Sequence, residues 1–229
     1  MTARLLALAC FGAALCAAAP RLVFVKEFPG SAPAYVLIHV DPDGKGEYLE
    51  AVDDDQPVKF HLLQTEAEAM FALAAKLDHF KHPLESGLKV ANMGKKTFRW
   101  ENEGESSEQV FNYSTDLDAQ ALLDWFEKIS ESANRFIDLQ RRAKFDRLGV
   151  HHSILLLETA WDKKRLVGLD QFLPLLDRIA NNDSYLNMAR ERAGKLAEAF
   201  RAELQKPAEA KSPEAKPADG KAPDAKANP

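Results

Sequence analysis

The fold class follows from Leu22-Val-Phe-Val-Lys-Glu-Phe28 and Tyr35-Val-Leu-Ile-His-Val40, two apolar runs close together in the chain. Both runs are rich in β-branched and aromatic residues, which is typical of strands. The first run stops at Pro29-Gly30 and the second at Asp41-Pro-Asp-Gly-Lys-Gly46, and both breaks are strong turn signals. The sequence therefore predicts neighbouring strands that begin an antiparallel sheet.

Further short strands are predicted after this pair, with one helix among them. The expected strands are Glu47–Val52, Val58–Leu62, Leu88–Ala91, Lys96–Trp100 and Gln109–Tyr113. The helix is expected from Thr65 to Phe80, because its apolar residues recur at helical spacing. Thr65 and Glu68 have the spacing of a capping box, so Thr65 is the expected N-cap.

From Asp116 onward the apolar period changes to that of helices. Four are expected, at about 116–148, 153–164, 170–180 and 184–204. The predicted class is therefore α+β, with an N-terminal antiparallel sheet and one helix followed by a helical C-terminal half. A sheet-rich part at 20–115 and a helical part at 116–205 fit either two small domains or a single domain over 20–205.

Both ends of the chain differ from this folded part. Residues 1–19 have one positive charge, an apolar run and then small alanines, the layout of a signal peptide, with cleavage expected after Ala18 or Ala19. The expected location is thus exported, either periplasmic or secreted. Residues 206–229 repeat lysine, proline, alanine and an acid with a period of five, and this composition predicts a disordered tail.

Composition excludes several classes of protein. Both cysteines, Cys10 and Cys16, lie in the predicted signal peptide, so the mature chain has no thiol for disulfides, zinc or nucleophilic catalysis. The net charge of −5 argues against a nucleic-acid partner. After cleavage, no apolar run is long enough to make a transmembrane segment. No motif indicates a cofactor.

The strongest metal signal is at Asp41 and Asp43, which match positions 1 and 3 of a calcium-binding loop. Position 5 is Lys45 and position 12 is Val52, so the pattern loses two ligands. A tight hairpin turn is the simpler interpretation. A calcium-dependent adhesion module would require both aspartates as ligands.

Aromatic residues alternate on two expected strands: Phe98 and Trp100 on one, Phe111 and Tyr113 on the other. Core packing of one sheet face explains this pattern. An exposed aromatic platform that binds a sugar or a peptide is the alternative.

Sequence motifs single out no catalytic site. The chain has no Gly-x-Ser-x-Gly elbow, no Ser-x-x-Lys and no His-Glu-x-x-His. His79 and His82 are three residues apart at an expected helix end, a spacing that metal ligands can use, but no third ligand accompanies them.

The arrangement Pro33-x-Tyr35, Ile38, Asp43-Gly44 and Tyr48, followed by a helix with Leu73 and Phe80, resembles a domain of unknown function in exported bacterial proteins. The resemblance covers about residues 22–100. It implies export and a bacterial source. It implies no activity and no site residues.

The sequence as a whole predicts an exported, non-catalytic binding or structural module of the bacterial cell envelope. A protein partner is expected to bind through the helical half. The alternative is a hydrolase that uses carboxylates in a cleft between sheet and helices.

Overall fold

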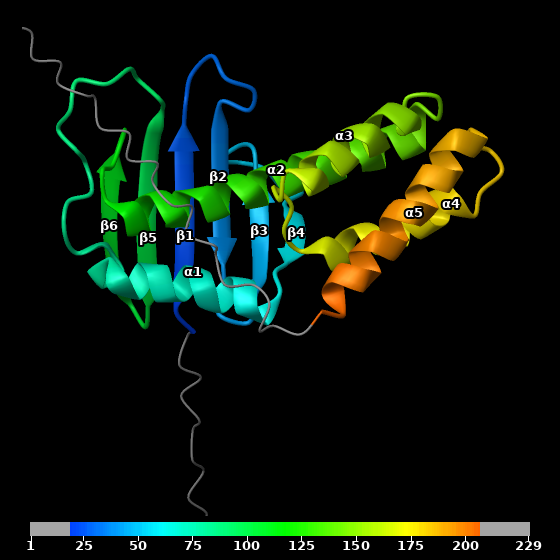
Figure 1. The fold of residues 1–229 in the computed structure, drawn as a ribbon. Helices are drawn as coiled ribbons and strands as arrows, with labels where there is room; N and C mark the ends of the chain where they lie inside the picture. Colours follow the sequence, from blue (N-terminus) through cyan, green and yellow to red (C-terminus); the bar gives the residue numbers. More distant parts are fainter. Residues whose placement is uncertain (1–18, 207–229) are drawn as a thin grey trace, which may run out of the picture.

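The computed structural model describes residues 19–206, so the predicted signal peptide except Ala19 and the predicted tail except Lys206 lie outside the described residues. The chain forms a sheet with one helix first and helices afterwards, as predicted (Figure 1). The elements in chain order are β1 (Arg21–Glu27), β2 (Tyr35–Val40), β3 (Lys45–Leu49), β4 (Val58–His61), α1 (Gln64–Lys76), η1 (Asp78–Phe80), β5 (Lys95–Asn102), β6 (Glu105–Phe111), α2 (Leu117–Phe145), α3 (Val150–Asp162), η2 (Leu169–Phe172), α4 (Leu173–Ala180) and α5 (Asn187–Leu204).

The six strands form one antiparallel sheet in the order β4-β3-β2-β1-β5-β6. Helices α1 and α2 lie across one face of this sheet (Figure 1). Successive side chains of a strand point to opposite faces, so Leu22, Phe24 and Ile38 meet the helices, where all three are buried. The rings of Phe24 and Phe126 stack with centroids 4.8 Å apart, which ties β1 to α2.

Two expectations about local structure were wrong. Residues 88–91 form no strand: the segment before β5 is a loop whose backbone polar groups are satisfied by other partners, including the Asn112 side chain. In α1 the N-cap is Leu63 instead of Thr65, and the Glu66 carboxylate accepts the Leu63 N–H at 2.9 Å. A glutamate one turn into the helix thus caps it without a hydroxyl at the N-cap.

Buried apolar side chains gather in two clusters. The first lies between the sheet, α1 and the first half of α2. The second lies between the end of α2, α3, α4 and α5. Helix α2 contributes Phe126 and Ile129 to the first cluster, and Leu139 and Ala143 to the second.

The segment between α3 and η2 joins the two parts of the fold. The Val167 N–H donates to Ser132 Oγ at 2.9 Å, and Arg165 Nε lies 3.2 Å from Glu131 Oε2. At Gly168 the backbone has φ +58°, and a Cβ there would lie 2.6 Å from the carbonyl oxygen of His61. Glycine is therefore required where the helical half meets β4.

Within residues 19–206, no helix is both long and apolar enough to cross a membrane.

Candidate functional site

The sheet face opposite α1 and α2 carries no helix of the described chain (Figure 1); we call it the open face. Cross-strand pairing sets its side chains in rows. One row is mostly apolar, and we call it the apolar row; it consists of Leu49, Leu37, Val25, Thr97 and Val110. Val110, on the edge strand, is nearly half exposed.

A charged row runs beside the apolar row. In it, His39 Nε2 lies 3.5 Å from Glu47 Oε2, and Glu47 Oε1 lies 4.0 Å from Lys59 Nζ. On the other side of β1, Arg99 Nε lies 2.8 Å from Glu108 Oε2. Alternating charge signs across neighbouring strands stabilise the pairing and hold these side chains in place.

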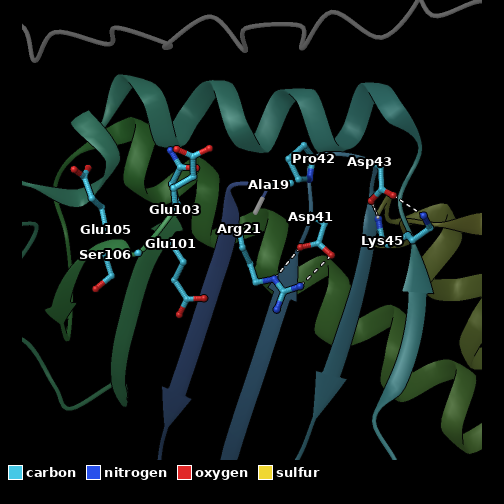
Figure 2. A pocket seen from close by; sticks show the side chains of 12 residues that line it. Ala19, Arg21, Asp41, Pro42, Asp43, Lys45, Glu101, Glu103, Glu105 and Ser106 are labelled. Atoms are coloured by element: carbon cyan, nitrogen blue, oxygen red, sulfur yellow. Dashed lines mark hydrogen bonds and ion pairs between the residues drawn. The ribbon is translucent and has the colours of Figure 1, made fainter. Parts of the chain in front are cut away.

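At one end of the open face lies a depression of about 900 Å³ (Figure 2). Its walls come from the start of β1, the β2–β3 turn and the β5–β6 turn. The residues lining it are Ala19, Arg21, Asp41, Pro42, Asp43, Lys45, Glu101, Asn102, Glu103, Gly104, Glu105 and Ser106. Three segments far apart in the sequence thus form one surface.

Both cations of the depression are held by carboxylates. Arg21 Nε donates to Asp41 Oδ1 at 2.8 Å and its Nη2 to Asp41 Oδ2 at 3.3 Å, a two-pronged contact drawn in Figure 2. The hydrogen bond with Asp41 raises the pKa of Arg21. Lys45 Nζ lies 2.6 Å from Asp43 Oδ2. Since these charges are paired, Arg21 and Lys45 leave little positive potential for an anionic ligand.

Carboxylates dominate the remaining wall. Glu101 lies 3.6 Å from Arg99 Nη1. Among the described residues, no ion pair engages Glu103 or Glu105. The depression therefore favours a cationic group, such as a lysine or arginine side chain.

The two candidate calcium ligands lie at this depression, in the β2–β3 turn. Asp41 accepts the Gly44 N–H at its carbonyl oxygen at 2.9 Å, and its side chain binds Arg21. Asp43 binds the Lys45 ammonium and accepts the Lys45 N–H at 3.1 Å. Hydrogen bonds from Lys45 hold the pKa of Asp43 below its ordinary value. Across the described chain, no three His, Cys, Asp or Glu residues are grouped to hold a metal ion.

The four aromatic residues with a candidate binding role do not share an open surface. Phe98 and Phe111 are buried in the sheet–helix cluster, with ring centroids 4.9 Å apart. Trp100 is partly buried and lies beside His79, with centroids 4.2 Å apart and the ring planes tilted by 39°. Tyr113 follows β6, where its hydroxyl lies 3.5 Å from Gln120 Nε2. Core packing, the simpler interpretation, therefore accounts for Phe98 and Phe111.

The paired histidines His79 and His82 also have local roles. His79 lies in η1, where residues 78–80 have positive φ, and its carbonyl oxygen accepts the Ser107 hydroxyl at 2.5 Å. His82 Nε2 lies 3.2 Å from Asp78 Oδ2. The His79 ring lies beside Trp100 and the His82 ring beside Asp78, so the two side chains engage different neighbours.

One charged residue of the sheet, Lys96, has a structural role that the sequence did not predict. Lys96 is buried, and its ammonium donates to the carbonyl oxygens of Asn112 at 2.7 Å and of Met93 and Gly94 at 3.3 Å. Burial lowers the pKa of Lys96. Its side chain links the loop before β5 to the residue after β6. No sequence pattern predicts which lysine makes such contacts.

The charged row makes stability depend on pH through His39. Burial, and then the charge of Arg21, lowers the pKa of His39 despite the nearby Glu47. As the pH falls below about 6.5, the unfolded chain takes up a proton on this residue more readily than the folded chain. We therefore expect the free energy of unfolding to fall from about pH 6.5 down to the folded-state pKa, and to level off below it.

Urea denaturation at a series of pH values measures this slope. We expect His39→Gln to reduce it, whereas His152→Gln, at an exposed position of α3, should leave it unchanged. Equal slopes for the wild type and His39→Gln would show that His39 does not cause the dependence.

No family model and no curated protein matches the chain.

Proposed function

We propose that this chain is an exported, non-catalytic binding module of the bacterial cell envelope that binds its ligand on the open face. The observation that carries the proposal is a six-stranded sheet with helices on one face only. On the other face the apolar row lies beside the charged row, and the acidic depression lies at one end. Apolar contact area beside fixed charges is the usual composition of a recognition surface.

The chemistry of the depression indicates the ligand. Its cations, Arg21 and Lys45, are paired with aspartates, while Glu103 in the β5–β6 turn and Glu105 at the start of β6 are exposed. The expected ligand is a segment of a protein with lysine or arginine side chains. Apolar residues of that segment would contact the apolar row, and its cations would bind the glutamates. The acidic net charge of the chain makes nucleic acid an unsuitable partner.

The helical half is a second candidate surface for a protein partner, as the sequence predicts. It would act together with the open face, because α2 joins the two parts.

The hydrolase alternative requires a general acid, a carboxyl group whose pKa is raised by its site. Hydrogen bonds and cations lower the pKa values of Glu85, Asp124 and Asp138, the last two despite partial burial. The interface between sheet and helices is filled by the first apolar cluster. No observation of the described part favours this alternative.

Photo-crosslinking in the producing cells tests the proposal. Val110 is replaced by a photoreactive phenylalanine derivative, and a matched variant carries the same group at Val52, which is exposed outside the sheet. We expect a discrete adduct from position 110 and none from position 52. Neutralising the turn with Glu103→Gln and Glu105→Gln should reduce that adduct.

Two outcomes would overturn the proposal. One is the same adducts from both positions, which would mean random collision. The other is turnover of an envelope substrate by the purified protein at a rate that a single carboxylate substitution abolishes.

A further inference from the structure

Four large apolar side chains are exposed at the end of the helical half. Phe145 and Leu148 are each 74% exposed, Met188 is 55% exposed and Leu186 is 41% exposed. Phe145 is the last residue of α2 and Leu148 lies in the turn to α3, while Leu186 and Met188 lie at the start of α5. We call these four residues the apolar tip.

The two segments that carry the apolar tip are held together. The Tyr185 hydroxyl donates to the carbonyl oxygen of Ala143 at 2.8 Å, and both residues belong to the second apolar cluster. The α2–α3 turn and the α4–α5 turn lie at the same end of the helical half, away from the sheet (Figure 1). The tip is thus made of two adjacent turns.

Folding does not require apolar residues at these positions. The neighbours that pack inward are Ala143, Val150 and Ala189, and all three are buried. The tip side chains are oriented away from that cluster and into solvent. Exposed phenylalanine and leucine in adjacent turns, above a complete core, indicate contact with another apolar medium.

The charge around the tip is opposite to that of the chain. Residues 141–152 and 181–191 contain five arginines or lysines and three acids, while the whole chain has a net charge of −5. Asp183 is paired with Arg190 at 2.6 Å, and Asp146 accepts from Arg142 at 3.1 Å and from the Gly149 N–H at 3.0 Å.

Two cations next to the tip are available to a partner. The Lys144 ammonium lies 5.0 Å from the centre of the Phe145 ring, which is itself largely exposed to solvent. Among the described residues, no carboxylate is paired with Lys144 or Arg147. An apolar end bordered by lysine and arginine complements the interface of a bilayer with anionic headgroups.

We propose that the apolar tip is a peripheral membrane contact: Phe145, Leu148, Leu186 and Met188 enter the interfacial region of an anionic lipid bilayer, and Lys144 and Arg147 bind its headgroups. The cationic border favours an anionic lipid surface, and a protein partner is an outcome of the test. This inference is independent of the open face, because the two surfaces share no residue.

Flotation with lipid vesicles tests it, using the protein purified from its producing cells. We expect binding to vesicles that contain phosphatidylglycerol, and little binding to pure phosphatidylcholine. Binding should weaken as salt is raised, because headgroup attraction is screened. The double substitution Phe145→Ser with Leu148→Ser should lower the partition coefficient about tenfold or more, because two apolar side chains would no longer enter the bilayer.

Matched controls distinguish binding through the tip from nonspecific binding of the protein to vesicles. Leu117→Ser with Val52→Ser removes two similarly exposed apolar side chains outside the tip, and it should leave vesicle binding unchanged. Lys144→Gln with Arg147→Gln should lower binding and its salt dependence together. All variants keep the same chain ends, so the ends cannot cause a difference between them.

Three results would overturn the proposal. They are no binding to anionic vesicles, equal losses for the tip and control variants, and a dimer in analytical ultracentrifugation that Phe145→Ser with Leu148→Ser converts to a monomer. The last result would assign the tip to a second copy of this chain. None of the three would affect the crosslinking test of the open face.

Discussion

Phe98→Ala is expected to lower the free energy of unfolding by about 3–5 kcal/mol, the range for removing a buried phenylalanine from a core. Phe98 is fully buried on β5, and its ring centroid lies 4.9 Å from that of Phe111 and 5.3 Å from that of Phe80. It also lies within 6 Å of the rings of Phe24 and Phe126. Removing it leaves a cavity where β1, β6, η1 and α2 meet, and rigid rings around it cannot close the gap.

Urea denaturation of Phe98→Ala measures the loss, with Phe145→Ala as the control. Phe145 is of the same residue type but largely exposed, so its replacement should change stability by less than about 0.5 kcal/mol. A Phe98→Ala protein as stable as the wild type would contradict the core position of Phe98. It would favour the alternative, in which Phe98 belongs to an exposed aromatic binding surface.

Gly168→Ala is expected to lower the free energy of unfolding by about 2–4 kcal/mol. Two costs add: the backbone has φ +58°, which alanine adopts with strain, and the new Cβ would lie 2.6 Å from the His61 carbonyl oxygen. Because that oxygen belongs to the backbone of β4, the strand or the α3–η2 segment has to move. The loss should therefore affect the contact between the helical half and the sheet.

Gly104→Ala is the matched control for this prediction. Gly104 has φ +85° in the β5–β6 turn, but nothing lies within 4 Å of a Cβ built there. Its replacement carries only the backbone cost, about 1 kcal/mol. Chemical denaturation of both variants gives the difference, which reports the steric contact with His61. Equal losses at the two glycines would contradict a close approach at Gly168.

The sequence predicted most elements because local signals and tertiary packing agree there. In β1 and β2, β-branched and aromatic residues are bounded by turns, and the N-cap of α2 is Asp116, whose carboxylate accepts the N–H groups of Asp118 and Ala119. The segment 88–91 was mispredicted because its apolar residues have strand composition but find no ladder partner. Composition alone carries no information about a missing partner.

The candidate site was harder to predict than the fold. In β1 both faces are apolar, with Leu22 and Phe24 on one and Val23 and Val25 on the other, so alternation cannot tell which face the helices cover. The depression is lined by the start of β1 and by two turns. These segments lie side by side only because β1 is placed between β2 and β5 in the sheet. Only Asp41 and Asp43 had a sequence signal: a tight hairpin turn was the simpler interpretation and a calcium site the alternative, but neither indicated that the two aspartates pair with Arg21 and Lys45.

Helix α2 fixes the distance between the sheet and the far end of the helical half. Its 29 residues span about 43 Å at 1.5 Å per residue, and it runs from the sheet cluster into the second cluster as one uninterrupted helix. Such a helix holds the apolar tip at a fixed position relative to the sheet. If the apolar tip binds a bilayer, the sheet stays at a constant distance from the membrane surface. The open face can then bind partners that lie away from that surface.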